Sequence, residues 1–68
     1  MYYFVWYNGA FIAQYKSVRA CLNFINRKGL KNDDRNQLDV VDQNGDLYDV
    51  ITGAKILSYE IRSILSSR

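Results

Sequence analysis

Residues 2–15 read YYFVWYNGAFIAQY, with the dipeptide Asn8-Gly9 between two runs of strand-forming residues. Asn and Gly tolerate the positive φ angles of tight hairpin turns, whose twist must match that of the flanking strands. We therefore predict a β-hairpin that joins a strand over Tyr2–Tyr7 to a strand over Ala10–Tyr15.

The dipeptide Asn44-Gly45 predicts a second hairpin, which joins Gln37–Asp42 to Asp46–Ile51. A two-residue turn there would pair Val40 with Asp49 and bring charge to both faces of the hairpin. A three-residue loop, with Gly45 as a bulge residue, instead pairs Val40 with Tyr48. Because the face of a strand is buried as a unit, we predict the bulged register.

In that bulged register Leu38 pairs with Val50, so that one face of the second hairpin is entirely apolar. Asp39 then stands opposite Asp49 on the other face. A pair of carboxylates could in principle serve acid–base chemistry, but such chemistry needs a substrate cleft, which a chain this small rarely encloses.

A helix is predicted over Ser17–Lys28, between the two hairpins. Ser17 can accept a hydrogen bond from a first-turn backbone N–H, and Gly29 can adopt the left-handed conformation that ends a helix. Leu30 can then fold back on Ile25. The apolar side chains at helical spacing form one stripe, which consists of Val18, Cys21, Leu22 and Ile25.

A second amphipathic helix is predicted over Lys55–Ser66, where apolar residues again recur at helical spacing, at Leu57, Ile61, Ile64 and Leu65. The expected order is therefore ββαββα in a single α+β domain over residues 1–68. We expect a four-stranded antiparallel sheet with the first helix packed across it. The C-terminal helix either completes that layer or packs against a second subunit.

Composition excludes several classes of function. The chain has 68 residues, no His, no Pro and one Cys, so it can form neither an internal disulfide nor the common zinc sites. Without an imidazole the usual Cys–His and Ser–His pairs cannot form, and Cys21 lies on the apolar stripe of the helix. We therefore expect that this protein is not an enzyme.

We also expect neither a cofactor nor a bound metal. Asp42, Asn44 and Asp46 match the first three ligand positions of an EF-hand loop. Leu47 and Gly53 then stand where that loop needs its Gly and its bidentate Glu, so the match fails.

No run of about 18 apolar residues is present, and no basic segment precedes an apolar stretch, so we expect neither a membrane span nor a secretory signal. A cytoplasmic location fits these features best. A chain of this size is also compatible with a phage, prophage or mobile-element product.

The strand over Tyr2–Tyr7 is apolar or aromatic on both faces, whereas a sheet with one solvated face should alternate. One helix covers only one face. The C-terminal helix, a second copy, another protein or water must cover the other, and a contiguous aromatic patch commonly marks an interface. The residues expected in a dimer or partner interface are Tyr2, Phe4, Trp6, Tyr7, Phe24 and Ile61.

Charge is unevenly distributed along the chain. Residues 16–35 hold six basic and two acidic residues, residues 36–54 hold four acidic residues and no basic one, and the whole chain has a net charge of +2. A basic helix face could meet nucleic-acid phosphates, with aromatic strand residues stacking on bases. The candidate nucleic-acid contacts are Lys16, Arg19, Arg27, Lys28 and Lys31. The low net charge and the acidic second hairpin weigh against this reading.

The leading expectation is thus a small non-enzymatic protein-interaction module that forms a homodimer and acts by binding another protein. A regulatory protein that binds nucleic acid through the basic face of the first helix is the alternative.

Overall fold

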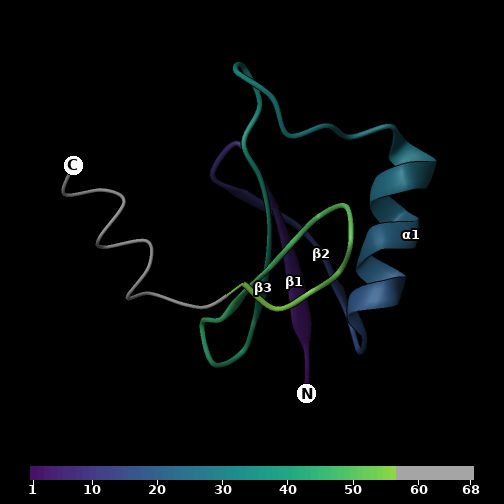
Figure 1. The fold of residues 1–68 in the computed structure, drawn as a ribbon, viewed down its shortest axis with the longest axis vertical. Helices are drawn as coiled ribbons and strands as arrows, with labels where there is room; N and C mark the ends of the chain where they lie inside the picture. The colour runs from purple at the N-terminus through teal and green to yellow at the C-terminus, as the bar shows by residue number, and fades with distance from the viewer. Residues whose placement is uncertain (57–68) are drawn as a thin grey trace, which may run out of the picture.

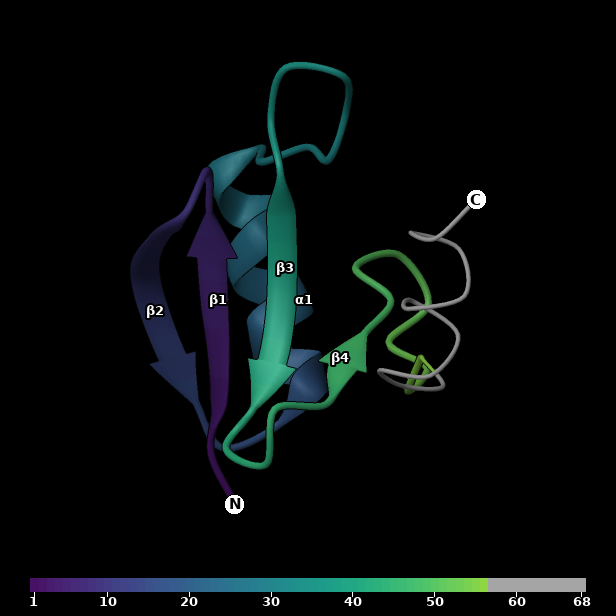
Figure 2. The ribbon, with the colours of Figure 1, turned by 90° about the vertical axis from the view of Figure 1, so that its left-hand side faces the viewer.

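The computed structural model describes residues 1–56. Along the chain the elements are β1 (Tyr3–Tyr7), β2 (Ala10–Tyr15), α1 (Val18–Lys28), β3 (Leu38–Asp42) and β4 (Leu47–Tyr48). The four strands form one antiparallel sheet in the order β2-β1-β3-β4 (Figure 2), and α1 lies against one face of it (Figure 1). The expected α+β class is confirmed. At the first two positions of the helix expected over Lys55–Ser66 the prediction is wrong, because Lys55 and Ile56 pair with β4. The rest of that segment, with Ile61, lies outside the described residues.

The first turn forms as predicted. Tyr7 pairs with Ala10, and both residues between them have positive φ, 52° at Asn8 and 81° at Gly9. Asn8 also connects this turn to the start of β3, because its amide donates to the Gln37 carbonyl at 2.7 Å and its side-chain oxygen accepts from the Gln37 amide at 2.8 Å. The turn therefore aligns β1 against β3 as well as against β2.

A β-bulge in β2, for which the sequence carries no glycine or other turn signal, changes which residues face the helix. Trp6 pairs with Phe11 and Val5 pairs with Ala13, so Ile12 is the additional residue. An unbroken ladder would place Gln14 opposite Tyr3, on the face that α1 covers. The bulge moves Gln14 to the other face and brings Tyr15 opposite Tyr3 instead. A polar amide thereby avoids burial, and an aromatic ring takes its place beside the helix.

The helix α1 begins and ends where the sequence predicts. The Ser17 hydroxyl accepts a hydrogen bond from the Ala20 amide at 3.1 Å. Gly29 has a φ of 66°, and the Leu30 amide donates to the Ile25 carbonyl at 3.1 Å, which is the Schellman arrangement. The apolar stripe is confirmed too, because Cys21 and Ile25 are buried in the core.

The second hairpin adopts the predicted bulged register. Val40 pairs with Tyr48, and the loop closes through the Gly45 amide, which donates to the Asp42 carbonyl at 2.9 Å. Gly45 has a φ of 87°, the left-handed conformation that the bulge position requires.

The second strand of that hairpin is shorter than predicted, because β4 ends at Tyr48 and the expected pair of Leu38 with Val50 does not form. The Asp49 carboxylate accepts hydrogen bonds from the amides of Ile51, at 2.7 Å, and Thr52, at 2.9 Å. A side chain that binds its own following amides favours a turn over a strand. The chain therefore turns back after Tyr48, and Asp49 belongs to this turn rather than to a ladder opposite Asp39.

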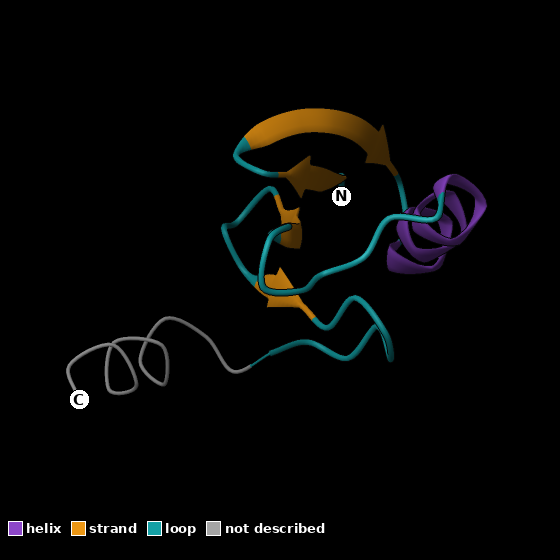
Figure 3. Cartoon of the chain, turned by 90° about the horizontal axis from the view of Figure 1, so that it is seen from above, coloured by secondary structure: helices purple, strands orange, loops and turns teal. Residues whose placement is uncertain are grey.

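The core lies between α1 and the sheet. Its fully or almost fully buried apolar side chains come from β1, α1 and β3: Val5, Cys21, Ile25, Leu38 and Val40. Seen from above, α1 occupies one side of the sheet, beside β2 and β1 (Figure 3). The returning segment after β4 reaches the same helix, since Gly53 lies close to Leu22 and Val18.

Candidate interaction surface

The face of the sheet that points away from α1, which we call the outer face, carries a cluster of apolar side chains. Side chains alternate between faces along a strand, so the burial of Val5 under α1 places its neighbours Phe4 and Trp6 on the outer face. Cross-strand partners share a face, which adds one apolar residue from each of the other strands. The cluster consists of Phe4, Trp6, Phe11, Val41 and Leu47.

The aromatic rings of this cluster contact one another. Phe11 lies 6.0 Å from Phe4 and 5.9 Å from Trp6, measured between ring centroids. Trp6 is 38 % exposed and Phe11 is 51 % exposed. Such ring pairs contribute about 0.5–1.5 kcal/mol beyond the area they bury. The result is a contiguous aromatic surface of which Trp6 and Phe11 are exposed.

An open groove of 400 Å³ runs beside Trp6 on this face. Val41 and Leu47 form part of its apolar wall, and Asp39 provides a carboxylate. Asp39 stands opposite Trp6 in the β1–β3 ladder, and its carboxylate accepts a hydrogen bond from the Gln37 side chain at 3.1 Å. One groove of the outer face is therefore lined by the Trp6 indole, by the apolar side chains of Val41 and Leu47, and by the Asp39 carboxylate.

The expected interface residues separate into two groups. Phe4 and Trp6 lie on the outer face, and Tyr2 is exposed directly before β1. Tyr7 and Phe24 instead pack against the core on the α1 side, where the Phe24 ring lies 5.8 Å from that of Tyr15. Ile61 is outside the described residues. The structure therefore divides the five described residues between the outer face and the core side of the sheet.

Sequence reasoning missed the contributions of β2, β3 and β4 to the outer face. Phe11 could have been found, because a two-residue turn at Asn8-Gly9 by itself places Phe11 opposite Trp6. Val41 and Leu47 could not be assigned in this way. Their position depends on the pairing of β1 with β3, for which the sequence carries no turn signal.

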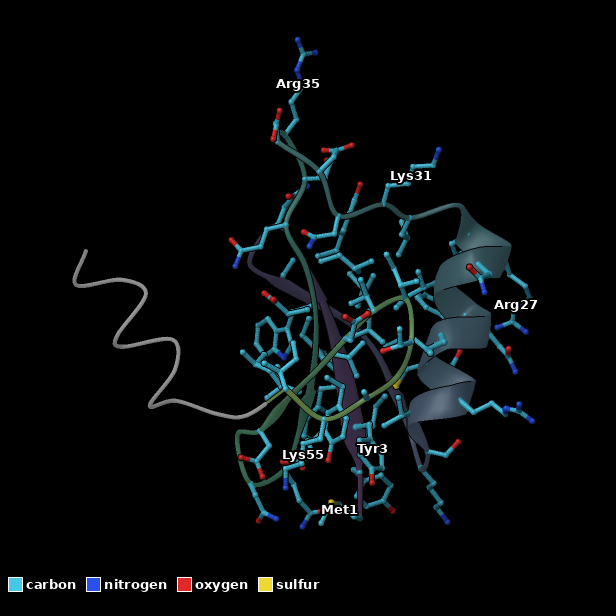
Figure 4. The ribbon with its side chains drawn as sticks, in the orientation of Figure 1. Met1, Tyr3, Arg27, Lys31, Arg35 and Lys55 are labelled. Atoms are coloured by element: carbon cyan, nitrogen blue, oxygen red, sulfur yellow. The ribbon has the colours of Figure 1, made fainter. Side chains whose placement is uncertain are left out.

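The candidate nucleic-acid contacts are all exposed and follow α1 and the segments that flank it: Lys16, Arg19, Arg27, Lys28 and Lys31. In Figure 4 the side chains of Arg27 and Lys31 point outward from this side of the molecule. The sheet separates them from the outer face, so the basic residues and Trp6 do not share a surface. Among these residues, Arg27 lies beside an aromatic side chain, since its guanidinium donates to the Tyr15 hydroxyl at 3.5 Å.

Cys21 is fully buried, and its thiol lies 3.8 Å from the Tyr3 carbonyl. Burial raises the pKa of the Cys21 thiol, which disfavours the reactive thiolate. This cysteine therefore behaves as a small core side chain.

Asp42 is 3 % exposed, yet its carboxylate is fully used within the fold. One oxygen accepts hydrogen bonds from the amides of Asn44 at 2.8 Å and Asp46 at 3.1 Å, and the other accepts from the Tyr48 hydroxyl at 2.8 Å. Burial by itself would raise the pKa of Asp42, but the hydrogen bonds from Tyr48 and the two amides outweigh it and hold this pKa below its usual value. Asp42 thus closes the second turn.

Within residues 1–56, no three His, Cys, Asp or Glu side chains are grouped so that they could hold a metal ion.

A second cavity, of 530 Å³, opens where α1 ends, and core residues Ile25 and Leu38 form part of its wall. Its polar lining includes Asn26, Lys31, Asn32, Asp39 and Asp49, none of which is buried. The outer face differs from this cavity in carrying contiguous aromatic rings, of which Trp6 and Phe11 are exposed. We therefore place the candidate site on the outer face.

Among the described residues, no helix is long and apolar enough to cross a bilayer. Comparison of the chain with protein-family models, with curated proteins and with solved structures found no match.

Proposed function

We propose that this protein is a small non-enzymatic interaction module that self-associates. We propose that it binds another protein through the outer face of its sheet. The observation that carries the proposal is the ring cluster of Phe4, Trp6 and Phe11, in which the rings contact one another while Trp6 and Phe11 remain exposed. Contiguous apolar surface on a small soluble chain commonly serves as an interaction site. Tryptophan is also the residue type most enriched among the residues that dominate binding energy.

The chemistry of the groove defines the partner segment that it fits. Trp6, Val41 and Leu47 would take apolar side chains, and Asp39 would pair with a basic residue beside them. Much of the gain in free energy would come from covering the indole, since apolar burial contributes about 25 cal/mol per Å². The Asp39 carboxylate would contribute mainly orientation and specificity.

Substitution Trp6→Ala tests the outer face directly. Tagged wild-type protein and the variant are used to capture partners from an extract of the cells that encode the protein, and each captured partner is then purified and titrated. Trp6 is the only tryptophan of the chain, so binding at the outer face should shift its fluorescence to shorter wavelength. We expect Trp6→Ala to weaken binding at least about tenfold.

Ile51→Ala is the matched control, because Ile51 is an apolar side chain that is 86 % exposed in the turn after β4. It should leave both binding and stability unchanged. If Trp6→Ala lowers only the free energy of unfolding, while each partner binds as tightly as before, Trp6 is a structural residue and the proposal fails.

Nucleic-acid binding is the second candidate, and the exposure of five basic residues along α1 and its flanks supports it. Phosphate contacts release counterions, so such binding must weaken steeply as salt rises. Fluorescence anisotropy with single- and double-stranded oligonucleotides at low salt tests it, and an unchanged signal with both would eliminate this candidate.

A further inference from the structure

The two edges of the sheet differ in how their backbone groups are satisfied. At the β4 edge the chain turns back and pairs with its own strand: Lys55 forms a bridge with Tyr48, and the Ile56 amide donates to the Leu47 carbonyl at 2.8 Å. Lys55 also forms a salt bridge with Asp46 at 3.0 Å. A short strand, a covering segment and a lysine are all features that prevent an edge from pairing with another chain.

The β2 edge has much less of this protection. β2 is the longest strand, with six residues, and within residues 1–56 no segment pairs with its outer side. Residues 1–15 contain no charged side chain, and the chain contains no proline. Phe11 and Ile12, in the middle of this edge, are 51 % and 39 % exposed. The bulge at Ile12 is the one protective feature that β2 carries, since bulges add local twist.

We infer that the proposed self-association occurs at this edge, where β2 of one copy pairs antiparallel with β2 of a second copy across a two-fold axis. The lack of charge on β2 indicates that its pairing partner is a second copy of the same strand. In a two-fold interface the same surface patch of the two copies meets, so a charge near the axis would lie close to the like charge of its copy. The strand AFIAQY carries no charge and therefore meets its copy without repulsion.

This pairing also has a consequence for the outer face. Two sheets that join edge to edge form one sheet of twice the width, and the two outer faces then lie on the same side. Phe11 belongs both to the outer-face cluster and to β2, so it would lie close to the two-fold axis. The aromatic surfaces of the two copies would become continuous, which doubles the area offered to a partner protein.

The test uses the full chain and compares one substitution at the two ends of the sheet. Ile12→Lys places a charge in the middle of the β2 edge, whereas Ile51→Lys places the same charge in the exposed turn beyond β4. Molar mass is measured by light scattering across a dilution series. We expect the wild type and Ile51→Lys to be dimers, and Ile12→Lys to dissociate with a constant at least about tenfold higher because like charges then face one another.

Hydrogen exchange of the wild-type amides identifies the contact without any substitution. Dimerisation through β2 must slow the exchange of those β2 amides that point away from β1, in a manner that depends on protein concentration. A wild-type chain that stays monomeric at high micromolar concentration would overturn the inference. So would a dimer whose β2 amides exchange at the same rate at all concentrations.

The two proposals fail separately. A dimer in which Trp6 fluorescence shifts with concentration while β2 exchange does not change would contradict the edge contact and leave the outer face as the interaction surface. The converse result is a dimer that pairs through β2 and whose binding of a partner protein is unchanged by Trp6→Ala. That result would contradict only the proposed role of the outer face, and the edge contact would stand.

Discussion

Asp42 is the one buried polar residue among residues 1–56. A buried carboxylate is expensive unless its oxygens are hydrogen-bonded, and this one has three donors. The hydrogen bond to Asp42, together with burial, also raises the pKa of Tyr48 above its usual value, so the tyrosine hydroxyl remains a donor throughout the physiological range. Asp42 therefore acts as a structural clamp on the second turn.

Asp42→Ala should lower the free energy of unfolding by about 2–3 kcal/mol, because it leaves the Tyr48 hydroxyl and two amides without their acceptor. Chemical denaturation at neutral pH measures this loss. Asp34→Ala, at an exposed carboxylate in the loop before β3, is the control and should change the stability little.

The wild type should also lose stability in acid, in a defined direction. The pKa of Asp42 is lower in the folded chain than in the unfolded chain, so its contribution is complete above the ordinary Asp pKa of about 3.9 and is lost as the pH falls through the folded value. Amide hydrogen bonds lower the pKa of Asp33 and Asp49 as well, led by Arg35 and Thr52 respectively. Asp42→Ala should therefore reduce the acid dependence without abolishing it, and an unchanged pH profile would refute the clamp.

At the scale of elements, the turn that follows β4 packs against α1, and Val50 at its start packs against the core. Its contact with the helix depends on Gly53, which has a φ of 78°. A Cβ atom there would lie 3.1 Å from the Leu22 Cδ1 atom and 3.3 Å from the Val18 Cγ1 atom. The absence of a side chain therefore lets the turn approach the helix closely.

Gly53→Ala should destabilise the fold more than Gly45→Ala, which is its matched control. Both positions have positive φ, so each substitution costs about 1 kcal/mol in backbone strain. A Cβ atom at Gly45 meets no atom within 4 Å, whereas the Cβ atom at Gly53 pushes against α1 and adds about 1 kcal/mol. Thermal unfolding of both variants tests the difference, and equal losses would show that the turn can move away from the helix at no cost.

At the scale of the whole molecule, the sheet divides the surface by chemistry. Five exposed basic residues lie on α1 and the segments that flank it, and the aromatic cluster lies on the outer face. Single-strand binding combines phosphate contacts with base stacking on one surface, and here the two kinds of residue lie on opposite sides. This division favours protein partners over nucleic acid.

The corresponding prediction concerns Arg27 and Lys28. Arg27→Gln with Lys28→Gln should leave the binding of a protein partner at the outer face unchanged, while Trp6→Ala weakens it. Titrations at low and moderate salt check both variants under the same conditions. A partner affinity that falls with the double substitution and also falls steeply with added salt would place the binding site on α1 instead.

The sequence predicted features that depend on neighbouring residues. The two turns, the two caps of α1 and the bulged register of the second hairpin follow from φ preferences and from the alternation of side chains over a few positions. It also predicted that the strand ending at Tyr7 has two apolar faces. It did not distinguish which aromatic residues would remain accessible, and so Tyr7 and Phe24 were grouped with Trp6.

Amino-acid order alone thus determined the local elements of this protein and the excess of aromatic surface on its first strand. Only the tertiary structure decided that β1 lies between β2 and β3, that α1 covers the Val5 face and that Ile12 forms a bulge. The physical reason is the separation along the chain of the residues that interact. Turns and caps are set by hydrogen bonds between residues close in the chain, whereas the choice of a buried face depends on packing between residues far apart, and that choice creates the outer face.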